Sequence, residues 1–89
     1  MYYVYVLYSE ERERKFYIGF TRDVEERLLS HNAGKNRSTK GSRWELVYYE
    51  AYASEKDARR RERSLKKHGQ SLRALKERIN GSLLSTELK

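Results

Sequence analysis

The sequence predicts an α+β fold: a small three-stranded antiparallel sheet flanked by helices, in the order ββαβαα. Three observations favour this fold. The chain has 89 residues, which is room for one small domain. Three short runs are rich in tyrosine and β-branched residues, as strands are. Stretches with apolar residues at helical spacing follow the second and the third run.

The first two runs predict a hairpin. Residues Tyr2 to Tyr8 are apolar on both faces, which is typical of a central strand. A short charged stretch separates them from the second strand, Phe16 to Phe20, so we expect the two strands to pair antiparallel. The third strand is expected over Glu45 to Tyr52, directly after Trp44.

A first helix is expected over Arg22 to Ala33. Thr21 is a suitable N-cap, and Asp23 in the first turn suits the positive end of the helix dipole. Gly34 can close this helix, because glycine adopts left-handed backbone angles without strain.

A second and a third helix follow the third strand. The second is expected over Glu55 to His68, with Ser54 as its N-cap and Gly69 directly after its end. Leucine and isoleucine residues at helical spacing predict the third helix between Ser71 and Gly81.

The composition excludes several classes of protein. The chain has no cysteine, so it has neither a disulfide framework nor a thiolate metal site. No apolar run reaches the roughly 18 residues of a membrane span, and the first residues lack the basic segment of a signal peptide. We therefore expect a cytoplasmic protein. With no proline and no low-complexity linker, it should form one domain over residues 1–81 with a frayed tail over residues 82–89.

Positive charge is concentrated in two segments. The chain carries 20 Lys and Arg against 13 Asp and Glu, a net charge of +7. Most of the excess lies in residues 35–43, which hold four basic residues and no acid, and in residues 54–78, which hold ten against four. Clustered positive charge favours a polyanionic partner such as nucleic acid. The alternative is a basic surface that only keeps the protein soluble.

Polar residues lie on the face of the first helix that its spacing assigns to the core. At about 100° per residue, Arg27 and His31 fall on the same stripe as Val24 and Leu28. Taken alone, Arg27 could extend along the edge of the stripe to water, and His31 could be a structural histidine.

A carboxylate occupies the apolar stripe of the second helix. Glu62 falls between Ala58 and Leu65, where a buried charge needs a partner. The simplest partner is Lys66, one turn later in an i,i+4 ion pair. The other interpretation is that the carboxylate belongs to a functional site.

Together these residues resemble a known pattern. Tyr3-Val4-Tyr5 is followed by Tyr17-Ile18-Gly19, and then by Arg27, His31 and Glu62 on later helices. The pattern resembles the GIY-YIG nuclease domain over about residues 2–68. It is most similar to the small single-domain bacterial members related to the N-terminal nuclease domain of excinuclease. The first motif has Tyr and Val in place of Gly and Ile, and no asparagine at a supported spacing follows the glutamate.

The resemblance implies roles for these residues. Tyr5 is the candidate general base, Tyr17 orients water or phosphate, and His31 assists Tyr5. The chemistry of phosphodiester hydrolysis adds two more roles. The guanidinium of Arg27 can bind the scissile phosphate through two hydrogen bonds. Glu62 can hold one divalent ion, Mg²⁺ or Mn²⁺, whose coordination is completed by water and phosphate oxygens.

Basic residues are the candidates for DNA contacts. The loop between the first helix and the third strand carries Lys35, Arg37, Lys40 and Arg43 without one apolar side chain, which suits contacts with backbone phosphates. A solvated connector is the alternative. Lys66 also matches the pattern of the family and is the fifth candidate.

We therefore predict a metal-dependent endonuclease that hydrolyses DNA phosphodiester bonds, in DNA repair or processing. The alternative is a non-catalytic nucleic-acid-binding module, although binding alone needs no polar residues on core-facing stripes. A protein-interaction adaptor would leave the basic loop unexplained. The sequence leaves open whether the DNA is single-stranded, branched or duplex, and whether RNA is also a substrate. It indicates no membrane and no obligate protein partner.

Overall fold

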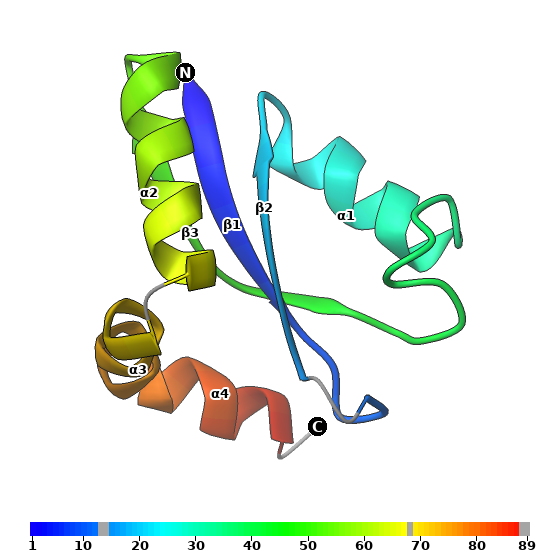
Figure 1. The fold of residues 1–89 in the computed structure, drawn as a ribbon. Helices are drawn as coiled ribbons and strands as arrows, with labels where there is room; N and C mark the ends of the chain where they lie inside the picture. The colour runs from blue at the N-terminus through cyan, green and yellow to red at the C-terminus, as the bar shows by residue number, and fades with distance from the viewer. Residues whose placement is uncertain (13–14, 68, 88–89) are drawn as a thin grey trace.

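The computed structural model describes residues 1–12, 15–67 and 69–87, without the side chains of residues 84–87. The elements, in chain order, are β1 (Tyr2–Tyr8), β2 (Phe16–Thr21), α1 (Val24–Asn32), β3 (Glu45–Tyr52), α2 (Glu55–Lys67), α3 (Gly69–Arg78) and α4 (Asn80–Glu87) (Figure 1). The predicted α+β fold with a three-stranded antiparallel sheet is confirmed.

The sheet has the order β2-β1-β3, so β1 is its central strand. Both neighbours pair with β1 antiparallel, and Tyr5 lies between Gly19 of β2 and Tyr49 of β3. A register shift in the β1–β3 pair falls between Val6 and Leu7. Central strands have both faces covered, which explains why an uninterrupted apolar sequence forms β1.

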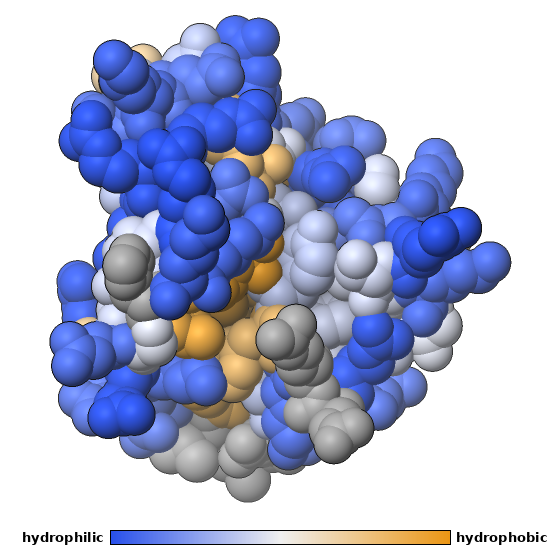
Figure 2. Space-filling model, in the orientation of Figure 1, coloured by the Kyte–Doolittle hydropathy of each residue, from blue (hydrophilic) through white to orange (hydrophobic). Residues whose placement is uncertain are grey.

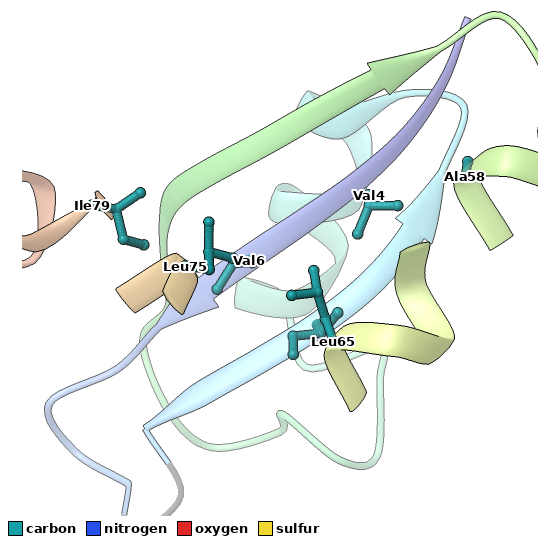
Figure 3. Close-up of a cluster of buried hydrophobic side chains, with 7 residues drawn as sticks. Val4, Val6, Ala58, Leu65, Leu75 and Ile79 are labelled. Atoms are coloured by element: carbon teal, nitrogen blue, oxygen red, sulfur yellow. The ribbon is translucent and has the colours of Figure 1, made fainter. Parts of the chain in front are cut away.

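One face of the sheet carries the larger core. Because side chains alternate along a strand, Val4 and Val6 point to the same face. Figure 3 shows them directed towards Ala58 and Leu65 of α2 and towards Leu75 of α3. Ile79, which follows α3, completes the cluster of buried side chains. This face therefore supplies most of the apolar burial that stabilises the fold.

The opposite face carries a smaller cluster next to α1. Tyr5, Leu7 and Trp44 are buried there, and Figure 1 shows α1 and α2 on opposite sides of the sheet. The side chain of Asn32 holds Trp44 at the end of α1: its Oδ1 accepts from the Trp44 backbone nitrogen at 2.7 Å, and its Nδ2 donates to the Trp44 carbonyl at 3.0 Å. The indole Nε1 donates to the carbonyl of Thr39 at 3.0 Å.

The start of α1 differs from the prediction. Asp23, not Thr21, is the N-cap, and its carboxylate accepts from the Glu26 backbone nitrogen at 3.1 Å. Thr21 is still part of β2, paired with Tyr3, and its hydroxyl accepts from the Asp23 backbone nitrogen at 3.0 Å. The prediction for the end of the helix is confirmed, because Gly34 follows it with a φ of +76°.

The C-terminal part of the chain contains one more helix than predicted. Ser54 caps α2 as expected, with its hydroxyl 3.4 Å from the Asp57 backbone nitrogen. The role predicted for Gly69 is wrong: it is the first residue of α3, and positive φ occurs among the described glycines only at Gly34 and Gly41. The predicted end of the second helix, His68, lies outside the described residues.

The tail expected to fray forms α4 over most of its length. Leu83 packs against the larger core cluster, which gives this segment an apolar contact that the weak sequence pattern did not reveal. Residues 88 and 89, the rest of the predicted tail, lie outside the described part of the chain. No described helix is long and apolar enough to cross a membrane.

Candidate active site

The site is organised around Tyr5, which is 1% exposed although it carries a polar hydroxyl. Its partner across the strand pair is Gly19, and the phenol ring lies over the glycine backbone. A Cβ atom added at Gly19 would lie 2.3 Å from both Cζ and the hydroxyl oxygen of Tyr5. Any other residue at this position would therefore displace the ring.

His31 of α1 meets the hydroxyl of Tyr5 inside the protein. The His31 side chain is 1% exposed, and its Nε2 lies 2.9 Å from the Tyr5 hydroxyl. The other ring nitrogen, Nδ1, lies 2.7 Å from Oγ1 of Thr39, which donates to the Asn36 carbonyl at 3.4 Å. With its proton used there, Thr39 accepts from Nδ1–H of His31. This assignment leaves Nε2 to accept the proton of the Tyr5 hydroxyl.

Tyr17 of β2 completes the aromatic part of the site. Its ring centroid lies 4.7 Å from that of His31, edge-on, and 6.3 Å from that of Tyr5. Its hydroxyl accepts a hydrogen bond from Nδ2 of Asn36 at 3.3 Å. Tyr17 is half-buried, whereas Tyr5 is fully enclosed. The two tyrosines therefore differ in their access to solvent.

Arg27 brings a positive charge to the Tyr5 hydroxyl, to which it hydrogen-bonds. Its Nε atom is buried and has no hydrogen-bond partner within the described structure. Leaving a buried donor unpaired costs roughly 1–3 kcal/mol, and more for a charged group. An anionic ligand at this position would satisfy the Arg27 guanidinium.

Burial and charge set the protonation of the central pair in opposite directions. Burial raises the pKa of Tyr5 above its ordinary value, against the hydrogen bond and charge of Arg27, which lower it. Burial lowers the pKa of His31, and the charge of Arg27 lowers it further. Near neutral pH, Tyr5 is thus a protonated phenol and His31 is a neutral imidazole.

Glu62 approaches the site from α2. Its side chain is 14% exposed, and Oε2 accepts from Nζ of Lys66 at 3.1 Å, so the ion pair expected from the sequence is present. The charge of Glu62 also raises the pKa of Tyr5, which places the carboxylate within electrostatic range of the buried pair. Among the described residues, no three His, Asp or Glu side chains form a complete metal site.

The predicted DNA-contacting cations occupy an anchored loop, not a free connector. Lys35, Arg37, Lys40 and Arg43 are all exposed. Arg12, in the turn between β1 and β2, donates to the loop carbonyls of Ser38 and Lys40 and to the hydroxyl of Ser42. The backbone nitrogen of Arg43 donates to Oε1 of Glu11 at 2.9 Å. These bonds hold the loop beside the site.

A groove crosses the sheet at β2, next to Tyr17. Figure 2 shows an apolar strip bordered by hydrophilic side chains on the face where β2, α2 and α3 meet. Four cations line the groove, and none of the described residues that line it is acidic. The lining cations are Arg12, Lys15, Lys66 and Lys76, and the apolar lining residues are Phe16, Ile18, Leu65 and Leu72.

Sequence reasoning missed the residues that orient the catalytic candidates. Thr39, Asn36, Asn32 and Arg12 all use their side chains to fix His31, Tyr17, Trp44 or the basic loop. Three of the four lie in or next to the loop between α1 and β3. The available signal was the density of asparagine, serine and threonine in that loop, which form local hydrogen bonds readily.

The comparison with known families decides the identity of the domain. A family model described as the GIY-YIG catalytic domain matches residues 1–80. The chain belongs to the GIY-YIG family. This is a nuclease family whose members generally use divalent metal ions. The assignment made from the two tyrosine motifs is thereby confirmed.

Curated relatives of the chain are small bacterial GIY-YIG proteins. The chain is 38% identical over 87 residues to a UPF0213 protein of Streptococcus pneumoniae serotype 4, covering 93% of this chain and 86% of that protein. It is 36% identical over 80 residues to a UPF0213 protein of Staphylococcus haemolyticus, covering 85% and 95%. A UPF0213 protein of Lacticaseibacillus paracasei is 42% identical over 59 residues, covering 64% of each chain. No solved structure is significantly similar.

The contact between Tyr5 and Gly19 leads to a stability prediction. Gly19→Ala should lower the free energy of unfolding by about 1–3 kcal/mol, because the added methyl group overpacks the Tyr5 ring. Urea unfolding followed by circular dichroism measures this change. Gly81→Ala is the matched control: a Cβ there meets nothing within 4 Å, and helical alanine gains about 0.5–1 kcal/mol over glycine. Equal stability of both variants would contradict the close contact.

The lowered pKa of His31 predicts how stability depends on pH. The unfolded chain takes up a proton at His31 near the ordinary value of about 6.5, whereas the folded chain takes it up only at lower pH. The free energy of unfolding should therefore fall as the pH drops below about 7. Urea titrations between pH 7.5 and 5.5 measure this slope, and His31→Gln should flatten it. An identical slope in the variant would refute the buried neutral imidazole.

Proposed function

We propose that this GIY-YIG protein is a divalent-metal-dependent endonuclease that hydrolyses DNA phosphodiester bonds. The observation that carries the proposal is the buried hydrogen-bonded chain from Tyr5 through His31 to Thr39, next to the unpaired Nε of Arg27. A proton acceptor and an anion-binding group thus lie side by side. Phosphodiester hydrolysis needs both, since a water must lose a proton while negative charge develops on the phosphate oxygens.

Tyr5 and His31 act as one basic unit in this proposal. The Tyr5 oxygen takes the proton of the attacking water while its own proton passes to Nε2 of His31, which is a neutral acceptor near neutral pH. The hydrogen bond from Nδ1 to Thr39 fixes the ring so that Nε2 faces Tyr5. This relay answers the difficulty that a phenol with a raised pKa is by itself a poor base.

Arg27 and Tyr17 bind and orient the substrate. A phosphate against the Arg27 guanidinium would pair the buried Nε atom and offset the charge that opposes protonation of His31. Substrate binding would therefore favour the proton transfer from Tyr5. Tyr17, held through Asn36, orients the phosphate or the water from the more exposed side of the site.

Glu62 is the residue that would hold the divalent ion. Mg²⁺ is commonly held by one or two carboxylates together with substrate phosphates and water, so a single carboxylate near the Arg27 phosphate site fits this ion. The bound ion supplies charge stabilisation at the phosphate oxygens. Glu62 is paired with Lys66 in the described structure, and Lys66 then becomes available for a phosphate of the substrate.

The surroundings of the site favour a nucleic acid as the substrate. The groove beside Tyr17 is lined by cations, and the exposed Lys35, Arg37, Lys40 and Arg43 extend positive charge along the anchored loop. Such contacts position a phosphate backbone without reading its sequence. A non-catalytic binding module is the alternative, but affinity for phosphates does not require an enclosed Tyr5–His31 pair. The pathway and the cytoplasmic location stay predictions.

Substitution of Tyr5 tests the chemistry. Tyr5→Phe keeps the ring over Gly19 and removes the oxygen that contacts His31, so it should fold and bind DNA but lose about 10²- to 10⁴-fold in cleavage rate. Tyr8→Phe is the control, because it loses a hydroxyl that contacts Glu10 in the same strand, away from His31. Single-turnover assays on a panel of labelled DNA structures with Mg²⁺ measure both. A fully active Tyr5→Phe variant would remove Tyr5 from the mechanism.

Substitution of Glu62 tests the metal dependence. Glu62→Gln should abolish cleavage while DNA binding in a chelator-containing buffer is unchanged, because the carboxylate serves the ion and not the DNA. Wild-type protein should likewise lose cleavage with chelator and regain it with Mg²⁺ or Mn²⁺. Cleavage assays and fluorescence anisotropy on the same oligonucleotide separate the two effects. Wild-type cleavage rates in the variant would show that Glu62 is not a metal ligand.

A further inference from the structure

A second polar cluster lies on the opposite face of the sheet from Tyr5. Its centre is Glu50 of β3, whose side chain is only 13% exposed. The carboxylate accepts hydrogen bonds from the hydroxyls of Tyr48, at 2.6 Å, and of Tyr52. It also accepts from Nε of Arg61 in α2, at 3.0 and 3.1 Å to its two oxygens. None of these four residues belongs to the site described above.

The cluster connects α2 to the sheet through charged groups. Burial raises the pKa of Glu50, but the hydrogen bonds from Arg61, Tyr48 and Tyr52 outweigh it and lower that pKa below its ordinary value. The same contact, after burial, raises the pKa of Tyr52 to about 12. Glu50 is therefore ionised throughout the neutral range, and its bonds to Arg61 and the tyrosines persist there.

The position of Arg61 on α2 explains why this connection matters. Ala58 and Leu65 are buried at the centre of the helix face that meets the sheet. At about 100° per residue, Arg61 and Glu62 flank that centre on opposite sides. Arg61 reaches Glu50 on β3, whereas the partner of Glu62, Lys66, lines the groove beside β2. One helix thus directs a cation to one edge of the sheet and the Glu62 carboxylate to the other.

Apolar packing alone fixes the rotation of such a helix weakly. Ala58 has a single methyl group, and the contact of Leu65 with the sheet is non-directional. A hydrogen-bonded guanidinium and carboxylate have a defined geometry and resist rotation about the helix axis. Any rotation that moved Arg61 away from Glu50 would move Glu62 relative to Tyr5 and Arg27.

We propose that Glu50 is a positioning residue: by holding Arg61 it sets the rotation of α2 and thereby aims Glu62 at the Tyr5–Arg27 site. The part that concerns Glu62 rests on the proposed nuclease function. Glu50 itself touches neither the phosphate site nor the ion, and it acts through the helix.

The test compares Glu50→Gln with the wild type in two measurements. The substitution keeps the shape of the side chain and removes its charge. The Mg²⁺ concentration that gives half-maximal single-turnover cleavage should rise about 10-fold or more, since loss of a residue that orients a metal ligand typically costs 10- to 100-fold in metal affinity. Excess Mg²⁺ should restore much of the rate. Residual dipolar couplings of the α2 amides, measured without metal or DNA, should change relative to those of β1.

Three further variants keep the result interpretable. Asp57→Asn makes the same charge change on an exposed side of α2, and it should leave both measurements unchanged. Arg61→Lys, which retains the charge but loses the guanidinium geometry, should shift both in the same direction as Glu50→Gln. In a Glu62→Gln background, Glu50→Gln should cause no further loss of residual cleavage. Thermal melts establish that each variant is folded.

The outcomes are distinct. Unchanged couplings in Glu50→Gln and Arg61→Lys would overturn the proposal, and so would an equal shift in Asp57→Asn, which would reveal a mere effect of net charge. Changed couplings with an unchanged Mg²⁺ requirement would overturn the link to Glu62. A wild-type protein that cleaves no DNA at any Mg²⁺ concentration would refute the proposed function instead, and the couplings would then still decide whether Glu50 orients α2.

Discussion

The ring of Tyr5 lies flat over Gly19 of the neighbouring strand, and the geometry of the site depends on that contact. Because the ring is pinned inside the sheet, its hydroxyl meets His31 at a fixed place. The two tripeptide motifs of the family therefore describe one structural unit: the tyrosine of the first needs the glycine of the second. Arg27 and Tyr17 are positioned against this unit from α1 and from the same hairpin.

The alternation of side chains along β1 separates stability from chemistry. Val4 and Val6 face the core beneath α2, α3 and α4, while Tyr5 faces the polar site beneath α1. The helix α2 nevertheless contributes to both sides, since Leu65 is buried in the core while Glu62 lies within electrostatic range of Tyr5. The catalytic candidates thus depend on the packing of a helix whose main contacts are apolar.

The strands, the polar stripe residues and the family were predictable because each left a periodic or spaced pattern in the sequence. Arg27, His31 and Glu62 stood out as polar residues at core-facing positions, and Arg27 and His31 do meet Tyr5. Thr39 and Asn36 could not be predicted, because their contacts depend on how an irregular loop folds back over α1. Glu50 alternates with tyrosines in β3 and looked like an ordinary exposed strand residue until Arg61 was found beside it. The extra helix α4 left no amphipathic pattern, and the cap at Thr21 failed because β2 extends one residue further than expected.

The clamp between Asn32 and Trp44 closes the segment between them at its base. Within that closed loop, Thr39 and Asn36 face inward to the histidine and the second tyrosine, while Lys35, Arg37 and Lys40 face outward. Inward and outward positions therefore answer to different demands during evolution. Mutations on the outer side can retune which nucleic acids are held, and how tightly, while the proton pathway behind them is left intact. Relatives that share this clamp can diverge in substrate preference through a handful of surface changes, with no need to rebuild the catalytic chemistry.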